Sequence, residues 1–190
     1  MISFRGQKVC SVNAKEFYPM IALVSDHPAS LIEMNPFSDC DVLTYNKLRH
    51  WGLNAALISD IFQYERNNEN SRYFLLTTQN DDFDQISQPS ILSIAKTTSM
   101  ADDEVMIDMI QVNPWYSSRR DWKDSKLPFK TFVECGKVTI QAFKNTFVNK
   151  DLWLHAPKNL INYFKKLGFE IVKSPDDKGD ALMKFSKNIK

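Results

Sequence analysis

Two carboxylates within one apolar segment are the side chains best suited to moving a proton. Glu104 and Asp108 stand four residues apart in residues 104–112, whose largely apolar side chains predict a strand covered on both faces. That spacing places both carboxylates on the same face of the strand. Asp108 lies between Ile107 and Met109, so burial would raise its pKa toward the range useful for a general base. The alternative is an ion pair with a nearby lysine or arginine.

A hydroxyl that could donate a proton lies in the helix predicted over residues 159–167. Tyr163 carries this hydroxyl, whereas its neighbour Phe164 cannot donate. One helical step turns a side chain by about 100°, so the two rings point in different directions. We expect Tyr163 either to act as an acid or to pack in the core or in an interface.

Binding of a phosphate group must rely on side chains, because glycines are scarce. The chain has five glycines, no two of them close together, which excludes the common glycine-rich phosphate loops. Residues 115–126 combine aromatic and basic side chains, among them Arg119 and Arg120. Guanidinium groups bind phosphate well. The alternative is an insertion loop whose charges are simply solvated.

Other classes of chemistry find little support in the sequence. The three histidines lack metal-ligand spacing, so we expect no metal site, and His155 is interpreted as a structural residue. Cys135 lies near an apolar stripe and is interpreted as part of the core. The net charge of +1 argues against nucleic acid as a partner. No run reaches the ~18 apolar residues that span a bilayer, and we expect a cytoplasmic protein.

The elements that would position these side chains alternate between helix and strand. Apolar periodicity predicts helices over residues 47–64, 128–145 and 159–167, and strands over 8–12, 72–78, 91–97, 104–112, 151–155, 170–173 and 181–185. Residues 25–45 are rich in turn formers and predict loops around a short helix. This order is typical of a mixed α/β fold, one twisted sheet with helices on both faces. We expect a single domain over residues 1–190.

The C-terminal half resembles the GNAT family of N-acetyltransferases. The strand over 104–112 leads into Val112 and Pro114, and a later helix ends in Leu-Gly-Phe at residues 167–169. The resemblance is strongest over residues 104–172, while the first hundred residues diverge. It implies a GNAT-like fold and an acyl-CoA donor, acetyl-CoA above all. The amide-rich arm of the donor would pair with the backbone around Gln111, Val112 and Asn113, with Arg119, Arg120 and Asn159 as further cofactor-binding candidates.

The residues that carry the family's chemistry depart from its pattern. No glycine stands in the loop between Pro114 and the following helix, where the family has the pattern Arg/Gln-x-x-Gly-x-Gly/Ala. The family's proton-donating tyrosine aligns with Phe164, which leaves the adjacent Tyr163 as the candidate acid. Of the two candidate bases we favour Glu104, which we expect to lie nearer the open end of the strand.

The resemblance favours transfer of an acetyl group to an amine that attacks directly from the side of the first two helices. The acceptor would be a small molecule or a protein amine, and a homodimer would fit the family. The alternative function is a non-catalytic GNAT-fold protein that binds a protein or small ligand in the same place. The absent glycines and Phe164 favour this alternative.

Overall fold

Eight strands form one mixed sheet in a computed structural model that describes residues 7–12, 29–64, 68–77, 91–114, 135–175 and 179–187. The strand order is β1-β2-β3-β4-β5-β6-β8-β7. Among these strands β5 and β6 pair in parallel and the other neighbours pair antiparallel. The strands are β1 Gln7–Val12, β2 Ala29–Met34, β3 Ser71–Thr77, β4 Ile91–Ala101, β5 Glu104–Val112, β6 Asp151–Pro157, β7 Glu170–Lys173 and β8 Asp180–Phe185.

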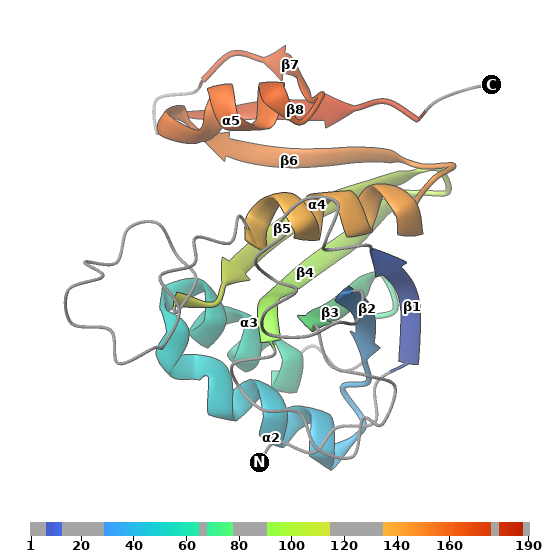
Figure 1. Ribbon diagram of the computed structural model, residues 1–190, viewed down its shortest axis with the longest axis vertical. Coiled ribbons are helices and arrows are strands. Elements are labelled where there is room, and N and C mark those ends of the chain that lie inside the picture. Colours follow the sequence, from blue (N-terminus) through green and yellow to red (C-terminus); the bar gives the residue numbers. More distant parts are fainter. Residues whose placement is uncertain are drawn as a thin grey trace.

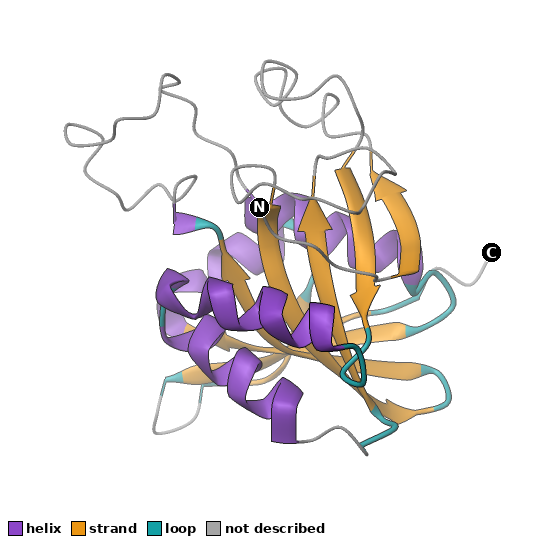
Figure 2. Cartoon of the chain, turned by 90° about the horizontal axis from the view of Figure 1, so that it is seen from below, coloured by secondary structure: helices purple, strands orange, loops and turns teal. Residues whose placement is uncertain are grey.

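Helices cover both faces of this sheet, as the sequence predicts (Figures 1 and 2). On one face lie α2 (Asp39–Leu48), the short η2 (Arg49–Trp51) and α3 (Leu53–Tyr64). On the other lie α4 (Cys135–Thr146) and, after η6 (Lys158–Leu160), α5 (Ile161–Lys166). Two apolar cores result, one beneath α2 and α3 and one beneath α4. No helix of the described residues is long and apolar enough to cross a membrane.

Two sequence predictions in the N-terminal half are wrong. Residues 25–45, expected to be loops around a short helix, contain strand β2, in which five of six side chains are buried. The single helix expected over residues 47–64 is broken at Gly52, whose φ of 149° and ψ of −178° are not helical. Only glycine readily adopts that conformation. The break turns the chain so that α3 begins next to the end of β5.

Charged pairs hold together the end of the sheet where β5 and β6 begin. Lys187 lies 2.6 Å from Asp103, and Lys184 lies 2.7 Å from Asp151. The backbone N–H of Lys187 also donates to Asp151, at 2.7 Å. The start of β5, the start of β6 and the end of β8 are thereby tied to one another. We call this the closed end of the sheet.

Replacing Asp151 with Asn should destabilise the protein at pH 7 and reduce its sensitivity to acid. Hydrogen bonds from Lys184 and from the Lys187 backbone lower the pKa of Asp151 from its ordinary 3.8. Because the folded pKa is the lower one, this stabilisation is present above about pH 4 and is lost as the pH falls through the folded pKa. Urea unfolding should show a loss of about 1 kcal/mol or less at pH 7, shrinking as the pH is lowered below 4.

The control is Asp102→Asn, in the turn between β4 and β5, because Asp102 forms no ion pair with the described residues. It should leave the acid limb of the stability curve unchanged. An equal loss for Asp151→Asn at every pH would contradict the assignment.

Candidate active site at the open end of the sheet

Strands β5 and β6 separate after a short stretch of parallel pairing. Their register runs only from Glu104 opposite Asp151 to Ile107 opposite Leu154, yet β5 continues to Val112 and β6 to Pro157. Figure 1 shows the carboxyl ends of the two strands diverging beside α4. Asp108 is the first residue of β5 beyond this pairing. It is also a bulge, because Ile107 pairs with Thr97 of β4 and Met109 with Lys96. A bulge bends its strand, so the separation begins at Asp108.

Beyond the bulge, two residues of β5 direct their backbone groups toward the gap that opens between β5 and β6. The Asn113 N–H donates to the Leu92 carbonyl of β4, so Asn113 and, by alternation, Gln111 face β4. Ile110 and Val112 therefore direct their N–H and C=O groups away from β4. The Ile110 carbonyl accepts a hydrogen bond from Asn54 Nδ2 on α3, at 3.3 Å. The Val112 carbonyl accepts one from Gln111 Nε2, at 2.9 Å.

This alternation changes the cofactor contacts expected from sequence. Of Gln111, Val112 and Asn113, only Val112 has its backbone directed toward the gap. Asn113 is fully buried, and its Nδ2 donates to the Ile91 carbonyl at 2.7 Å. Asn113 thus fixes the end of β5 to β4 and keeps it away from β6. The sequence motif could not reveal which of these three residues direct their backbone outward.

Asp108 is ion-paired at the point of separation. Its Oδ2 accepts hydrogen bonds from Lys96 Nζ at 3.0 Å and from the Thr98 hydroxyl at 2.6 Å. Lys96 is buried, with only 9% of its surface exposed. Among the described residues Oδ1 of Asp108 has no hydrogen-bond partner. The ion pair considered as an alternative from sequence is therefore present, and it leaves one carboxylate oxygen open.

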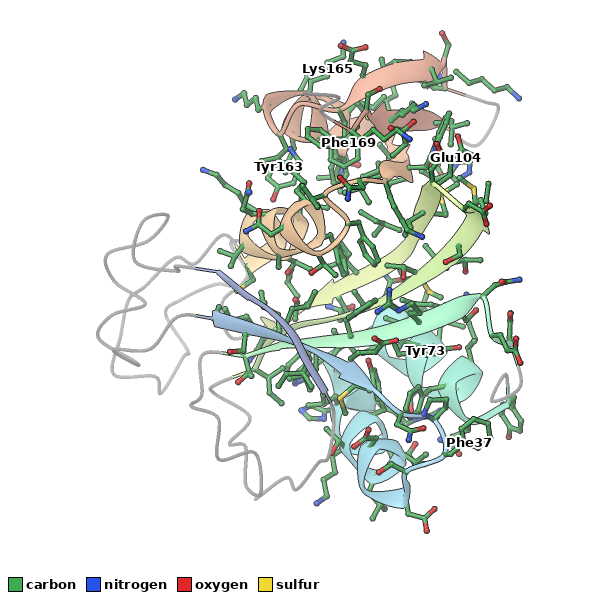
Figure 3. All side chains as sticks on the ribbon, turned by 90° about the vertical axis from the view of Figure 1, so that its right-hand side faces the viewer. Phe37, Tyr73, Glu104, Tyr163, Lys165 and Phe169 are labelled. Atoms are coloured by element: carbon green, nitrogen blue, oxygen red, sulfur yellow. The ribbon has the colours of Figure 1, made fainter. Side chains whose placement is uncertain are left out.

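Glu104 lies at the closed end, contrary to the expectation that it stands nearer the open end. It pairs with Asp151 in the first rung of the parallel register, about 13 Å along the strand from Asp108. Its charge contributes to the raised pKa of the Lys187 ammonium, whose largest cause is the hydrogen bond to Asp103. Figure 3 shows Glu104 and Tyr163 well apart in the upper part of the view, with Phe169 labelled between them. The four-residue spacing predicted that Glu104 and Asp108 share one face of the strand. It could not show at which end β5 and β6 separate.

Gly136 brings the end of β5, the first described turn of α4 and helix α5 together. A Cβ on Gly136 would lie 3.1 Å from the Tyr163 hydroxyl and 3.8 Å from Val112 Cγ1. Tyr163 therefore borders the gap at α4, whereas Phe164 packs against the core, 5.9 Å from the Phe169 ring. This is the reverse of the arrangement implied by aligning the family tyrosine with Phe164. Nothing in the sequence next to Gly136 signals this approach, because Tyr163 reaches it from another helix.

A buried hydroxyl pair holds this end of α4 on the sheet. Thr139 donates to the Cys135 carbonyl at 2.7 Å, and its Oγ1 lies 2.6 Å from the Ser93 hydroxyl of β4. Ser93 is directly opposite Val112 in the sheet. The first turn of α4 is thereby fixed beside the end of β5. Burial raises the pKa of the Cys135 thiol, so it remains protonated and belongs to the core, as predicted.

Two other residues singled out in the sequence are exposed, one on β6 and one just after it. Asn159 is exposed in η6, directly after the open end of β6. His155 is exposed on β6 itself. Arg119 and Arg120 lie outside the described residues. Within the part of the chain that the structure describes, no group of His, Cys, Asp and Glu could hold a metal ion.

The comparisons with known proteins identify the fold. No protein-family model matches the sequence, and no curated protein does. Solved structures do match. An acetyltransferase from Thermus thermophilus superposes with a TM-score of 0.53 at 11% identity, covering 83% of this chain and 94% of its own. The chain has a GNAT-like fold.

Two further structures share this GNAT-like fold. The N-acetyltransferase PseH of Campylobacter jejuni, in complex with acetyl coenzyme A, matches with a TM-score of 0.51 at 11% identity over 84% of this chain and 99% of its own. Aminoglycoside 6'-acetyltransferase type Ii matches with a TM-score of 0.51 at 16% identity over 81% and 94%. At such identities the likeness concerns the fold alone.

Gly136→Ala should be better tolerated when Tyr163 is replaced by Phe. Alanine stabilises a helix by up to about 1 kcal/mol relative to glycine, but its Cβ would meet the Tyr163 hydroxyl at 3.1 Å. Removing that hydroxyl leaves the ring carbon Cζ, at 4.0 Å, as the nearest atom of the side chain. Urea unfolding of the four proteins of the double-mutant cycle should show the more favourable effect of Gly136→Ala in the Tyr163→Phe background. Identical effects in both backgrounds would refute the contact.

Proposed function

We propose that this protein is an acyl-CoA-dependent N-acyltransferase that transfers an acetyl group from acetyl-CoA to an amine. The observation that carries the proposal is the separation of β5 from β6 at a bulged carboxylate, with the first described turn of α4 beside the end of β5. A gap of this kind lets an extended, amide-containing ligand replace the missing strand partner. The N–H groups of Ile110 and Val112, which point away from β4, would pair with such a ligand.

The donor would use three features of the open end. Its amide-rich arm would lie along Ile110–Val112, and its phosphates near the α4 end marked by Gly136, because helix N-termini favour anions. Arg119 and Arg120 would supply charge, and Asn159 would contact the donor from the end of β6. The complex of PseH with acetyl coenzyme A supports this choice of donor.

Asp108 and Tyr163 are the proposed catalytic residues. Asp108 Oδ1 would orient the acceptor amine and receive its proton, while Lys96 and Thr98 hold the carboxylate through Oδ2. Tyr163 would donate a proton to the departing thiolate. The acceptor would approach from the α2 and α3 side of the sheet, the face that carries Lys96. Glu104 remains a weaker candidate, because its position at the closed end separates it from these groups.

Acetyl-CoA should raise the thermal stability of the protein. A ligand that binds only the folded state stabilises it by about 2.7 kcal/mol at a concentration 100-fold above its Kd. Differential scanning fluorimetry with acetyl-CoA, and with ADP as the control nucleotide, measures the effect. An Arg119→Ala, Arg120→Ala variant should show a smaller shift. The absence of any shift at millimolar acetyl-CoA would overturn the enzyme proposal and leave the non-catalytic alternative.

Asp108→Asn should lower the rate of acyl transfer to a panel of amines by about 100-fold or more, the usual scale of general-base catalysis. Free thiol released from acetyl-CoA measures the rate. Asp102→Asn removes a carboxylate from the same hairpin at its closed end and should change the rate little. Glu104→Gln in the same assay decides between the two carboxylates. If it abolishes activity while Asp108→Asn does not, the assignment of the base is wrong.

A further inference from the structure

Lys96 places an amine where the acceptor of the proposed reaction would stand. It lies on β4 two residues from Ile94, which belongs to the core beneath α2 and α3, so its side chain is on that face of the sheet. This is the face from which an acceptor would approach. Its Nζ is one hydrogen bond, 3.0 Å, from Asp108, the residue at which β5 leaves β6.

Stability alone does not account for this lysine. An ion pair taken out of water gains little over a well-packed apolar pair of similar volume, because desolvation offsets the attraction. Lys96 has 11% of its side chain exposed and Asp108 has 24%. The pair therefore keeps a nucleophile and a proton acceptor together, partly shielded from water, at the place where an acyl group would be delivered.

We propose that Lys96 is a self-acylation site, an inference that rests on the proposed acyltransferase function. The Lys96 ammonium gives a proton to Asp108, and the neutral Nζ attacks the carbonyl carbon of the thioester. The new N–C bond forms as the C–S bond breaks. Tyr163 protonates the departing thiolate, as in the proposed reaction, and regains a proton from the two that Nζ loses. The products are an acylated Lys96 and free CoA thiol, with one proton released to solvent overall.

Acylation would change the state of Asp108. An amide carries no positive charge, so the carboxylate would lose the cation that now shares its Oδ2. Among the described residues, only Thr98 would then donate a hydrogen bond to Asp108. The modification therefore removes the cation that competes with an incoming ammonium for the charge of Asp108.

Lys184 provides a matched comparison within the same molecule. It too forms an ion pair, with Asp151 at 2.7 Å, and its side chain is more exposed, at 26%. It lies at the closed end, far from the gap. A chemical acylating reagent in solution should therefore prefer Lys184, whereas transfer from bound acetyl-CoA should prefer Lys96.

The experiment incubates the purified protein with isotopically labelled acetyl-CoA and maps acetylation by peptide mass spectrometry over time. N-acetoxysuccinimide serves as the chemical comparison. Lys96 should be labelled at least tenfold faster than Lys184 by acetyl-CoA, with the order reversed by the reagent. Lys96→Arg keeps the cation beside Asp108 but should abolish this labelling. Asp108→Asn should slow labelling of Lys96 and leave labelling of Lys184 unchanged.

Two outcomes would overturn the proposal, and they can be told apart. If acetyl-CoA raises the thermal stability but Lys96 is labelled no faster than Lys184, self-acylation is refuted and the acyltransferase proposal stands. If acetyl-CoA causes no stabilisation and no labelling, the proposed function fails and this inference fails with it.

Discussion

The short parallel pairing of β5 with β6 is the constraint on which the open end depends. Four residues of each strand are in register, from Glu104 and Asp151 to Ile107 and Leu154. The charged pairs of Asp103 and Asp151 with two lysines fasten the start of this stretch. The bulge at Asp108 ends it. A longer register would close the gap, and a shorter one would leave two half-sheets poorly joined.

Two buried polar contacts keep the diverging strand in place once this pairing ends. Asn113 holds the last residues of β5 against β4, and the hydroxyls of Ser93 and Thr139 hold α4 against the same edge. Removing one partner of a buried hydrogen bond costs about 1–3 kcal/mol. These residues therefore act on the geometry of the open end without facing it. Because these residues are buried, their role is not recognised when the sequence is read for exposed reactive side chains.

The sequence predicted the fold better than the site because the two depend on different information. Apolar periodicity sufficed for β5, β6 and the covered faces of the sheet, since burial determines that pattern. It could not predict the bulge at Asp108, which leaves no mark on the apolar pattern from Met106 to Met109. Nor could it place Gly136, which serves as a close-approach position only because Tyr163 comes to it from a distant helix. Strand register and contacts between residues distant in sequence are determined by the whole sheet.

The ion pair of Lys96 and Asp108 makes two interpretations of Asp108 compatible, namely a general base and a member of an ion pair. A carboxylate bound to a lysine is ordinarily a structural group, and one without a partner is a candidate base. Here the lysine bonds only to Oδ2, and no residue in the described part of the chain bonds to Oδ1, which could meet a second nitrogen. An acceptor that arrives as a cation must compete with Lys96 for the charge of Asp108, whereas a neutral amine need not. The pair would therefore favour neutral amines for as long as Lys96 carries its charge.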